Sequence, residues 1–204
     1  MIAIIDYGAG NIQSVSKALK HIGCDCFITN NKEEILSADG AVLPGVGSFG
    51  DTIDNMERLG IKEAVKEFIA SGKPFLGICL GLQLLFPASE ESPEVDGMGI
   101  FAGKIRKIPS DLGLKIPHMG WNNIEINPSS RLFKGIEKNP YVYFVHSYFL
   151  NAYERDIVAA QAEYGVIIDA AVEKGNVFAT QFHPEKSGET GLKILKNFAE
   201  IVEG

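Results

Sequence analysis

One cysteine, Cys79, lies in a Gly-x-Cys-x-Gly frame between an apolar run that favours a strand and an apolar run that favours a helix. This pattern is typical of a nucleophile elbow, a sharp turn that holds a reactive atom up at a sheet edge. Gly77 and Gly81 remove side-chain bulk on both sides of the thiol. We expect the following helix to point its N-terminus at the sulfur, which favours the thiolate. The pattern therefore predicts that Cys79 is a nucleophile.

A cysteine nucleophile needs a base within reach and a group that orients the base. Among the four histidines, His183 directly follows an apolar run and precedes Pro184. Open α/β sheets place their sites at such strand ends. In extended geometry His183 and Glu185 point the same way, so we expect a hydrogen bond between them. The alternative is a surface turn with a solvated glutamate, and spacing alone does not decide between the two.

The oxyanion that forms on an attacked carbonyl needs backbone donors. Residues 44–47, Pro-Gly-Val-Gly, follow a buried strand-like run, so the amides of Val46 and Gly47 are candidate donors beside the elbow. The amide of Leu80, directly after the nucleophile, is a further candidate. A simple glycine turn is the alternative interpretation of residues 44–47.

Length and composition indicate a globular chain of moderate size. The 204 residues are 46% hydrophobic and 22% charged, which fits one domain over residues 1–204. The net charge of −7 and the lack of a dense basic block argue against nucleic-acid binding. The apolar run 74–88 is shorter than the roughly 20 residues that a membrane span needs. The N-terminus also lacks the basic region of a signal peptide.

The cysteines Cys24, Cys26 and Cys79 have no disulfide-like spacing, which indicates a reducing cytoplasm. We expect no metal site, because Cys24 and Cys26 have no recognisable further ligands.

Gly8 and Gly10 suggest a dinucleotide loop only weakly, since the third glycine of that motif is missing. No cofactor is therefore expected.

The first third of the chain alternates strands and helices. Apolar spacing predicts strands over 2–5, 24–29 and 40–43, helices within 12–22 and 61–69, and then the elbow strand. Beyond residue 98 short strands predominate before a closing helix at 192–202. These strands are predicted over 100–108, 123–126, 141–145, 157–161, 166–173 and 177–181. The pattern indicates an α/β fold, a mostly parallel sheet with an antiparallel extension.

Six motifs resemble, in order and from end to end, those of the class I (triad-type) glutamine amidotransferases. The resemblance is greatest to the glutaminase subunits of imidazole glycerol phosphate synthase. The motifs occupy residues 4–12, 43–49, 77–85, 117–122, 143–148 and 181–187. The cysteine and His-x-Glu motifs mark the wider class, whereas Pro-Gly-Val-Gly and Pro-His-Met-Gly-Trp-Asn point to this subunit. Leu82 replaces a Met of many members at similar volume. The resemblance implies a flavodoxin-like three-layer fold.

The resemblance also implies roles for individual residues. Cys79 would attack the side-chain amide of glutamine, and His183 would act as general base and then protonate the departing ammonia. Glu185 would orient His183, and water would hydrolyse the glutamyl thioester to glutamate. The groups that would hold glutamine are Gln83 and the backbone near Gly47, Ser147 and Tyr148.

A partner is implied as well: a cyclase subunit of (β/α)₈-barrel fold that forms a heterodimer with this chain. It would use the ammonia to make imidazole glycerol phosphate and aminoimidazole carboxamide ribotide in histidine biosynthesis. Ammonia is mostly ammonium in neutral water, so a dry conduit would keep it nucleophilic. Residues 44–47 are expected to be unproductive until the partner binds its nucleotide, so the isolated chain should be a poor glutaminase. The positions implied at the interface or ammonia gate are Asn11, Trp121, Asn122, Tyr143 and Lys186.

Two alternatives stay open. The chain could serve another triad amidotransferase, such as that of pyridoxal phosphate, anthranilate or guanylate synthesis, with the same catalytic motifs and a different acceptor. It could also be an inactive binding or regulatory subunit, although the intact Cys79, His183 and Glu185 argue against that.

Overall fold

The computed structural model describes residues 1–8 and 11–204, so Gly10 of the weak dinucleotide motif lies outside the described residues. The strands are β1 Ile2–Ile5, β2 Cys26–Thr29, β3 Gly40–Gly45, β4 Phe75–Cys79, β5 Ala88–Ser89, β6 Gly103–Lys107, β7 His118–Asn123, β8 Glu125–Ile126, β9 Tyr141–His146, β10 Tyr148–Ala152, β11 Val158–Glu163, β12 Ile167–Lys174 and β13 Val177–Thr180. The α-helices are α1 Ile12–His21, α2 Lys32–Ser37, α3 Phe49–Arg58, α4 Ile61–Ala70, α5 Leu80–Gln83 and α6 Gly188–Glu203. Short 3₁₀ turns are η1 Ser110–Leu112, η2 Arg131–Phe133, η3 Arg155–Ile157 and η4 Pro184–Lys186.

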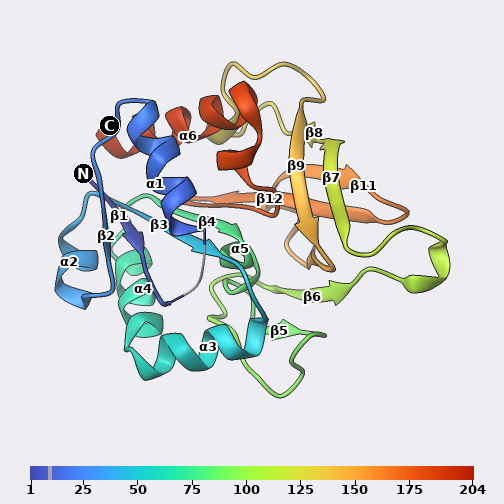
Figure 1. The fold of residues 1–204 in the computed structure, drawn as a ribbon, viewed down its shortest axis with the longest axis horizontal. Helices are drawn as coiled ribbons and strands as arrows, with labels where there is room; N and C mark the ends of the chain where they lie inside the picture. The colour runs from blue at the N-terminus through green and yellow to red at the C-terminus, as the bar shows by residue number, and fades with distance from the viewer. Residues whose placement is uncertain (9–10) are drawn as a thin grey trace.

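An eight-stranded sheet in the order β2-β1-β3-β4-β13-β12-β11-β8 forms the centre of the molecule (Figure 1). Strands β2, β1, β3, β4 and β13 are parallel to one another. Strands β12, β11 and β8 continue the sheet in antiparallel fashion. The order 2-1-3-4 is that of flavodoxin-like sheets. The prediction of a mostly parallel α/β sheet with an antiparallel extension is confirmed.

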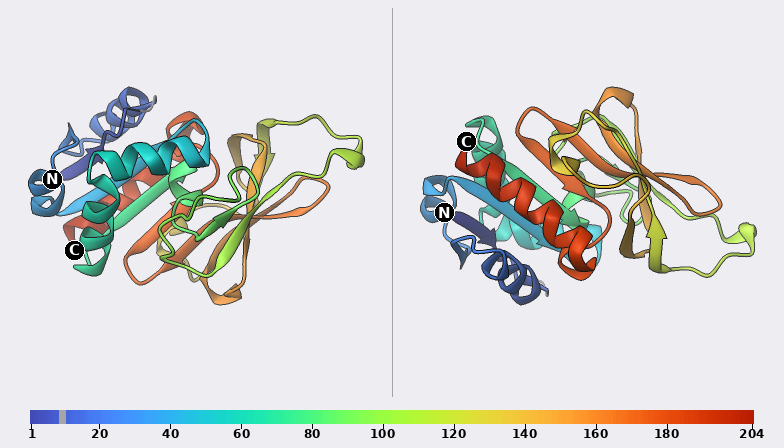
Figure 2. Two further views of the ribbon diagram at one scale, coloured as in Figure 1. Left: turned by 90° about the horizontal axis from the view of Figure 1, so that it is seen from below. Right: turned by 90° about the horizontal axis from the view of Figure 1, so that it is seen from above.

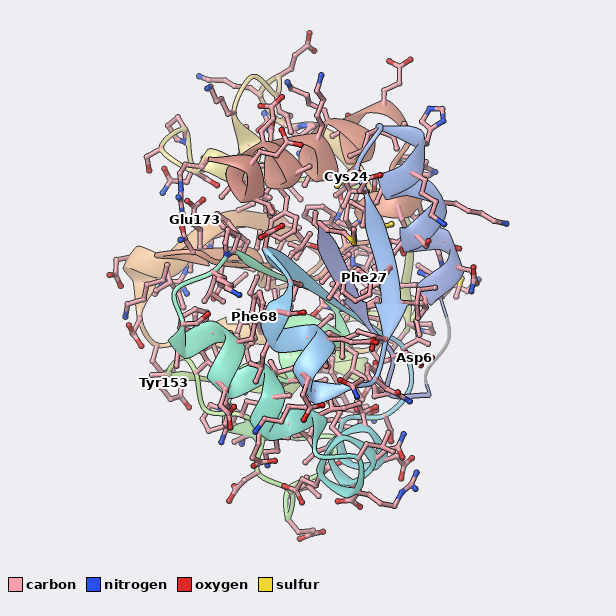
Figure 3. All side chains as sticks on the ribbon, turned by 90° about the vertical axis from the view of Figure 1, so that its left-hand side faces the viewer. Asp6, Cys24, Phe27, Phe68, Tyr153 and Glu173 are labelled. Atoms are coloured by element: carbon pink, nitrogen blue, oxygen red, sulfur yellow. The ribbon has the colours of Figure 1, made fainter. Side chains whose placement is uncertain are left out.

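Helices cover both faces of the parallel half, because alternate side chains of a strand point to opposite faces. Ile2 and Ile4 belong to one buried cluster with residues of α1 and α6. Ala3 and Ile5 belong to a second cluster with residues of α2, α3 and α4. Figure 3 views the molecule from the β2 edge, with α6 on one side of the sheet and α4, which carries Phe68, on the other. The predicted three layers are confirmed.

Two smaller sheets flank the antiparallel half (Figure 2). One has the order β10-β6-β5, and the other is the antiparallel pair β7-β9. Val142 and Phe144 of β9 are buried in one cluster with Ala159, Ala162 and Ile168 of β11 and β12. The pair β7-β9 therefore packs one face on the large sheet and turns the other face outward.

Several elements differ from the prediction. Strand β2 begins at Cys26 rather than Cys24, and β3 continues through Pro44 to Gly45, where it pairs with β4. Helices α2 and α3 and strands β5, β7 and β10 were not predicted. Helix α2 is only six residues long and buries Ile35 alone, so it carries no apolar repeat. Helix α3 does bury Phe49, Ile53 and Met56.

Across residues 1–8 and 11–204, no helix has both the length and the apolar character that a bilayer crossing requires.

Candidate active site

The carboxyl ends of three neighbouring strands form the site. Strand β4 lies between β3 and β13 and is parallel to both, with Cys79 opposite Gly45 and Ile78 opposite Thr180. The segments that follow the three strands therefore leave the sheet at the same edge. They carry the candidate oxyanion loop, the candidate nucleophile and the His-x-Glu motif, so this edge collects all three groups.

The turn at Cys79 is strained. Cys79 has φ 56° and ψ −107°, a conformation that residues with a side chain rarely adopt. A Cβ on Gly77 would lie 2.6 Å from the Gly81 carbonyl oxygen, and a Cβ on Gly81 would collide with the carbonyl oxygen of Leu43. Gly77 and Gly81 are thus required because backbone approaches backbone closely at this turn, whereas the sequence suggested only that they leave space beside the thiol.

The helix after the turn is short. Helix α5 spans only Leu80–Gln83 before the chain turns again. A dipole needs several aligned peptide units, so the helix-dipole support predicted for a thiolate is weaker than expected. Gln181 supplies a different support, since its Nε2 donates to the Cys79 Sγ at 3.6 Å.

His183 and Glu185 form a buried pair. The Nδ1 of His183 lies 2.7 Å from Oε1 of Glu185, and the two side chains are 1% and 0% exposed. Pro184 begins the turn η4, so the two residues are brought together by a 3₁₀ turn and not by the extended geometry that was predicted. Asn11 Nδ2 donates to the same carboxylate oxygen. Nε2 of His183 has no hydrogen-bond partner among the described residues.

The electrostatics of His183 are set by three effects. Burial lowers the pKa of His183, because it disfavours the charged ring. The neighbouring Cys79 sulfur and the hydrogen-bonded, negatively charged Glu185 carboxylate outweigh burial and raise this pKa to about 9. The ring is therefore poised to hold a proton that is taken from the thiol.

A cavity of about 310 Å³ opens over these groups. It is lined by Val46, Gly47, Cys79, Leu80, Gln83, Glu91, Val145, His146, Ser147, Tyr148 and His183. It brings together the predicted nucleophile and base, the three predicted oxyanion residues and the three predicted substrate-binding residues. Glu185 lies behind His183, as an orienting group should.

The candidate oxyanion loop borders two cavities. Val46 and Gly47 also line a second cavity, of about 440 Å³, that Tyr7 and Asn55 line too. Gly47 has φ 113°, a conformation open to glycine, and Gly45 packs against Leu80 and Gly81 of the elbow. In this second cavity, burial raises the pKa of the Tyr7 phenol. Donation to an oxyanion by the amides of Val46, Gly47 and Leu80 stays a prediction.

Three polar residues of the site were not predicted from the sequence. Glu91 lines the cavity, and its Oε2 accepts from the Phe49 amide at 2.8 Å. Gln181 contacts the thiol, and His146 lines the cavity between β9 and β10. Glu91 follows another glutamate in a polar stretch, which resembles a solvated turn, so nothing local marks it. His146 and Gln181 lie inside the motifs at 143–148 and 181–187. Their place in those motifs could have identified them as site residues.

The residues predicted at the interface do not all lie together. Trp121 and Tyr143 face each other across β7-β9, with ring centroids 6.1 Å apart, and Trp121 is 57% exposed. Lys186 is exposed on η4, the turn after His183. Asn122 points to the opposite face of β7, where its Nδ2 donates to the Glu163 carbonyl, because neighbouring strand residues alternate. Asn11 lies against Glu185.

No group of three or more His, Cys, Asp or Glu side chains within residues 1–8 and 11–204 is arranged to hold a metal ion.

Comparison with known proteins gives consistent matches. The model of the family described as glutamine amidotransferase class-I matches residues 3–202. An imidazole glycerol phosphate synthase subunit HisH of Caldanaerobacter subterraneus subsp. tengcongensis is 52% identical over 203 residues, which cover 100% of this chain and 99% of the relative. The subunit of the same name from Methanothermobacter thermautotrophicus is 50% identical and covers 99% of each chain. A solved structure described as a glutamine amidotransferase superposes with a TM-score of 0.78 at 18% identity over 100% of both chains, which shows the fold.

Replacing the orienting carboxylate should lower the pKa of His183. Glu185→Gln keeps an oxygen that can accept from Nδ1 and removes the negative charge, so the imidazolium loses stabilisation and its pKa should fall by about one pH unit or more. An NMR titration of the His183 ring measures this. Glu189→Gln, an exposed change on α6, is the matched control. An unchanged pKa in Glu185→Gln would show that the carboxylate does not act on the ring.

Proposed function

Because this chain belongs to the class-I glutamine amidotransferase family, we propose that it is the glutaminase subunit of an imidazole glycerol phosphate synthase. Relatives named as that subunit match it over nearly their whole length. The observation that carries the proposal is the 310 Å³ cavity in which Cys79 and His183 lie together. We propose a single glutaminase domain over residues 1–204 that acts in the cytoplasm on free glutamine and feeds histidine biosynthesis.

The proposed reaction begins when His183 takes the proton of the Cys79 thiol through its free Nε2. The thiolate attacks the carbon of the glutamine side-chain amide, and the tetrahedral oxyanion is held by the amides of Leu80 and of Val46 or Gly47. His183 returns the proton to the amide nitrogen, the C–N bond breaks and ammonia leaves. Water activated by His183 then cleaves the thioester, which releases glutamate and restores the thiol.

Glutamine recognition follows from the groups left free around the cavity. Gln83 uses Nε2 to donate to the Tyr148 carbonyl at 2.9 Å and to Oε1 of Gln181 at 3.0 Å. Both protons of that amide nitrogen are then used, so Gln83 offers substrate its Oε1 as an acceptor. The Glu91 carboxylate suits the α-ammonium group of an amino acid. Ser147 and Tyr148 also line the cavity.

We propose that the partner, a (β/α)₈-barrel cyclase in a heterodimer, covers the outer face of β7-β9. Met119, Trp121 and Tyr141 are 59%, 57% and 62% exposed on this face. Large exposed apolar and aromatic side chains gathered on one face are typical of a protein interface. The same strand β9 reaches the site, since the Tyr143 carbonyl accepts from the His183 amide and Val145 lies beside Cys79. Ammonia would leave past Trp121, Tyr143 and Lys186.

The function is tested by separating glutamine from ammonia as nitrogen source. In a complex with the cyclase subunit, Cys79→Ala should abolish synthesis from glutamine and leave synthesis from an added ammonium salt intact, because that route bypasses Cys79. Cys26→Ala removes a thiol outside the cavity and is the matched control. Loss of both activities in Cys79→Ala, or activity only with another synthase, would overturn the proposal.

Glu91 should control glutamine affinity. Glu91→Gln keeps an acceptor for the Phe49 amide and removes the charge that would pair with the substrate ammonium group. The KM for glutamine should rise about tenfold or more with a smaller change in kcat. The neighbouring Glu90→Gln, which alters surface contacts with Lys104 and Arg106, is the control. Equal KM values for the two variants would remove Glu91 from the substrate site.

A further inference from the structure

Two buried histidines form a hydrogen-bonded pair that the proposed reaction does not use. Nδ1 of His118 on β7 lies 3.0 Å from Nε2 of His146 on β9. The other ring nitrogen of His146, Nδ1, lies 2.9 Å from the Tyr148 carbonyl oxygen, and the other nitrogen of His118 lies 3.4 Å from Asn122 Nδ2. The two residues are 3% and 6% exposed. A continuous chain of polar contacts thus runs from Asn122 to Tyr148.

The chemistry of the two ends fixes the direction of this chain. A carbonyl oxygen only accepts, so His146 Nδ1 must carry the proton, and in a neutral ring its Nε2 then accepts. His118 must therefore donate from Nδ1 and accept at Nε2. Asn122 presents its amide nitrogen there, because the same nitrogen donates to the Glu163 carbonyl at 2.9 Å and Oδ1 accepts from the Asn123 amide at 2.9 Å. Every bond points from Asn122 toward Tyr148.

The chain ends on a carbonyl that belongs to the substrate cavity. The Tyr148 oxygen accepts from both His146 and Gln83, so both of its lone pairs are used and its peptide is held in one orientation. Gln83 in turn fixes the orientation of Gln181, because Gln83 donates to the Gln181 side chain. Gln181 then donates to the Cys79 sulfur. The buried histidine pair therefore supports the wall that would hold glutamine and the amide that contacts the thiol.

The surroundings keep both rings neutral, as the direction of the chain requires. Burial lowers the pKa of His118 to about 4. Burial, together with the neighbouring His118, lowers the pKa of His146 to about 3. His118 is also stacked between Phe144 and Tyr164, with ring centroids 4.6 Å and 4.0 Å away. A second cation beside His183 would oppose its protonation, and a neutral His146 avoids this.

We propose that His118 and His146 are positioning residues for glutamine binding, which hold the Tyr148 carbonyl and the Gln83 amide through a neutral, one-directional chain of hydrogen bonds. This inference rests on the proposed function and adds to it the groups that set the shape of the substrate site. Neither ring contacts the thiol, so neither is a catalytic residue.

A pair of substitutions at one position tests the inference in the complex with the cyclase subunit. In His146→Asn the amide nitrogen can occupy the place of Nδ1 and still donate to Tyr148, whereas His146→Gln puts its amide near His118 and loses that donor. The KM for glutamine should rise about tenfold in His146→Gln, with kcat less affected, and stay within about threefold in His146→Asn. Equal KM values for the two variants would overturn the proposal. His21→Asn, at the exposed end of α1, is the control.

The unaltered chain gives a second readout that does not depend on how a variant folds. Nitrogen-15 NMR of the imidazole rings should show His118 and His146 neutral, each with its proton on Nδ1, at pH 7. A proton on Nε2 alone in either ring, or a charged ring, would overturn the proposal. If the wild-type complex consumed no glutamine, the proposed function would fail, while the tautomers would still decide whether the chain has the inferred direction.

Discussion

The site depends on the parallel pairing of β4 with β13. This pairing sets Thr180 opposite Ile78 and so brings together Gln181 and Cys79, which are 102 positions apart in the chain. Closing so long a loop is only modestly more costly in entropy than closing a short one, since the cost grows with the logarithm of length. Burial of every residue in both strands offsets it. Without that pairing Cys79 would have no base and His183 no thiol.

The strained turn at Cys79 is a second consequence of the same sheet. A residue held at positive φ costs about 1–3 kcal/mol and persists only where the surroundings impose it. Here Gly81 lies directly against the Leu43 carbonyl of β3, and Gly45 lies against Leu80. The elbow is thus held from the side that also carries the candidate oxyanion loop. Any shift of β3 relative to β4 would move the nucleophile and its candidate donors together.

The types of residue in the sequence predicted the chemistry of the site better than they predicted its geometry. Cys79 could be named from its Gly-x-Cys-x-Gly frame, whereas spacing alone left His183 and Glu185 open to a surface turn, and the resemblance of the motifs assigned their roles. The local geometry was harder: His183 and Glu185 meet through a 3₁₀ turn, and Asn122 points inward beside His118. Strand β7 and the position of Glu91 depend on contacts with distant segments, which no local pattern contains. Helix α3, in contrast, could have been predicted from the sequence. Its buried residues Phe49, Ile53 and Met56 recur near helical spacing.

The central claim is that Cys79 is the nucleophile and lies in a site shaped for glutamine. The most direct measurement is covalent labelling of the chain, with the cyclase subunit present, by a glutamine analogue that carries a diazoketone in place of the carboxamide. Peptide mass spectrometry should find one label per chain, on Cys79 and not on Cys24 or Cys26, and excess glutamine should prevent it. Labelling of another residue, or none while glutamine is being hydrolysed, would contradict the account.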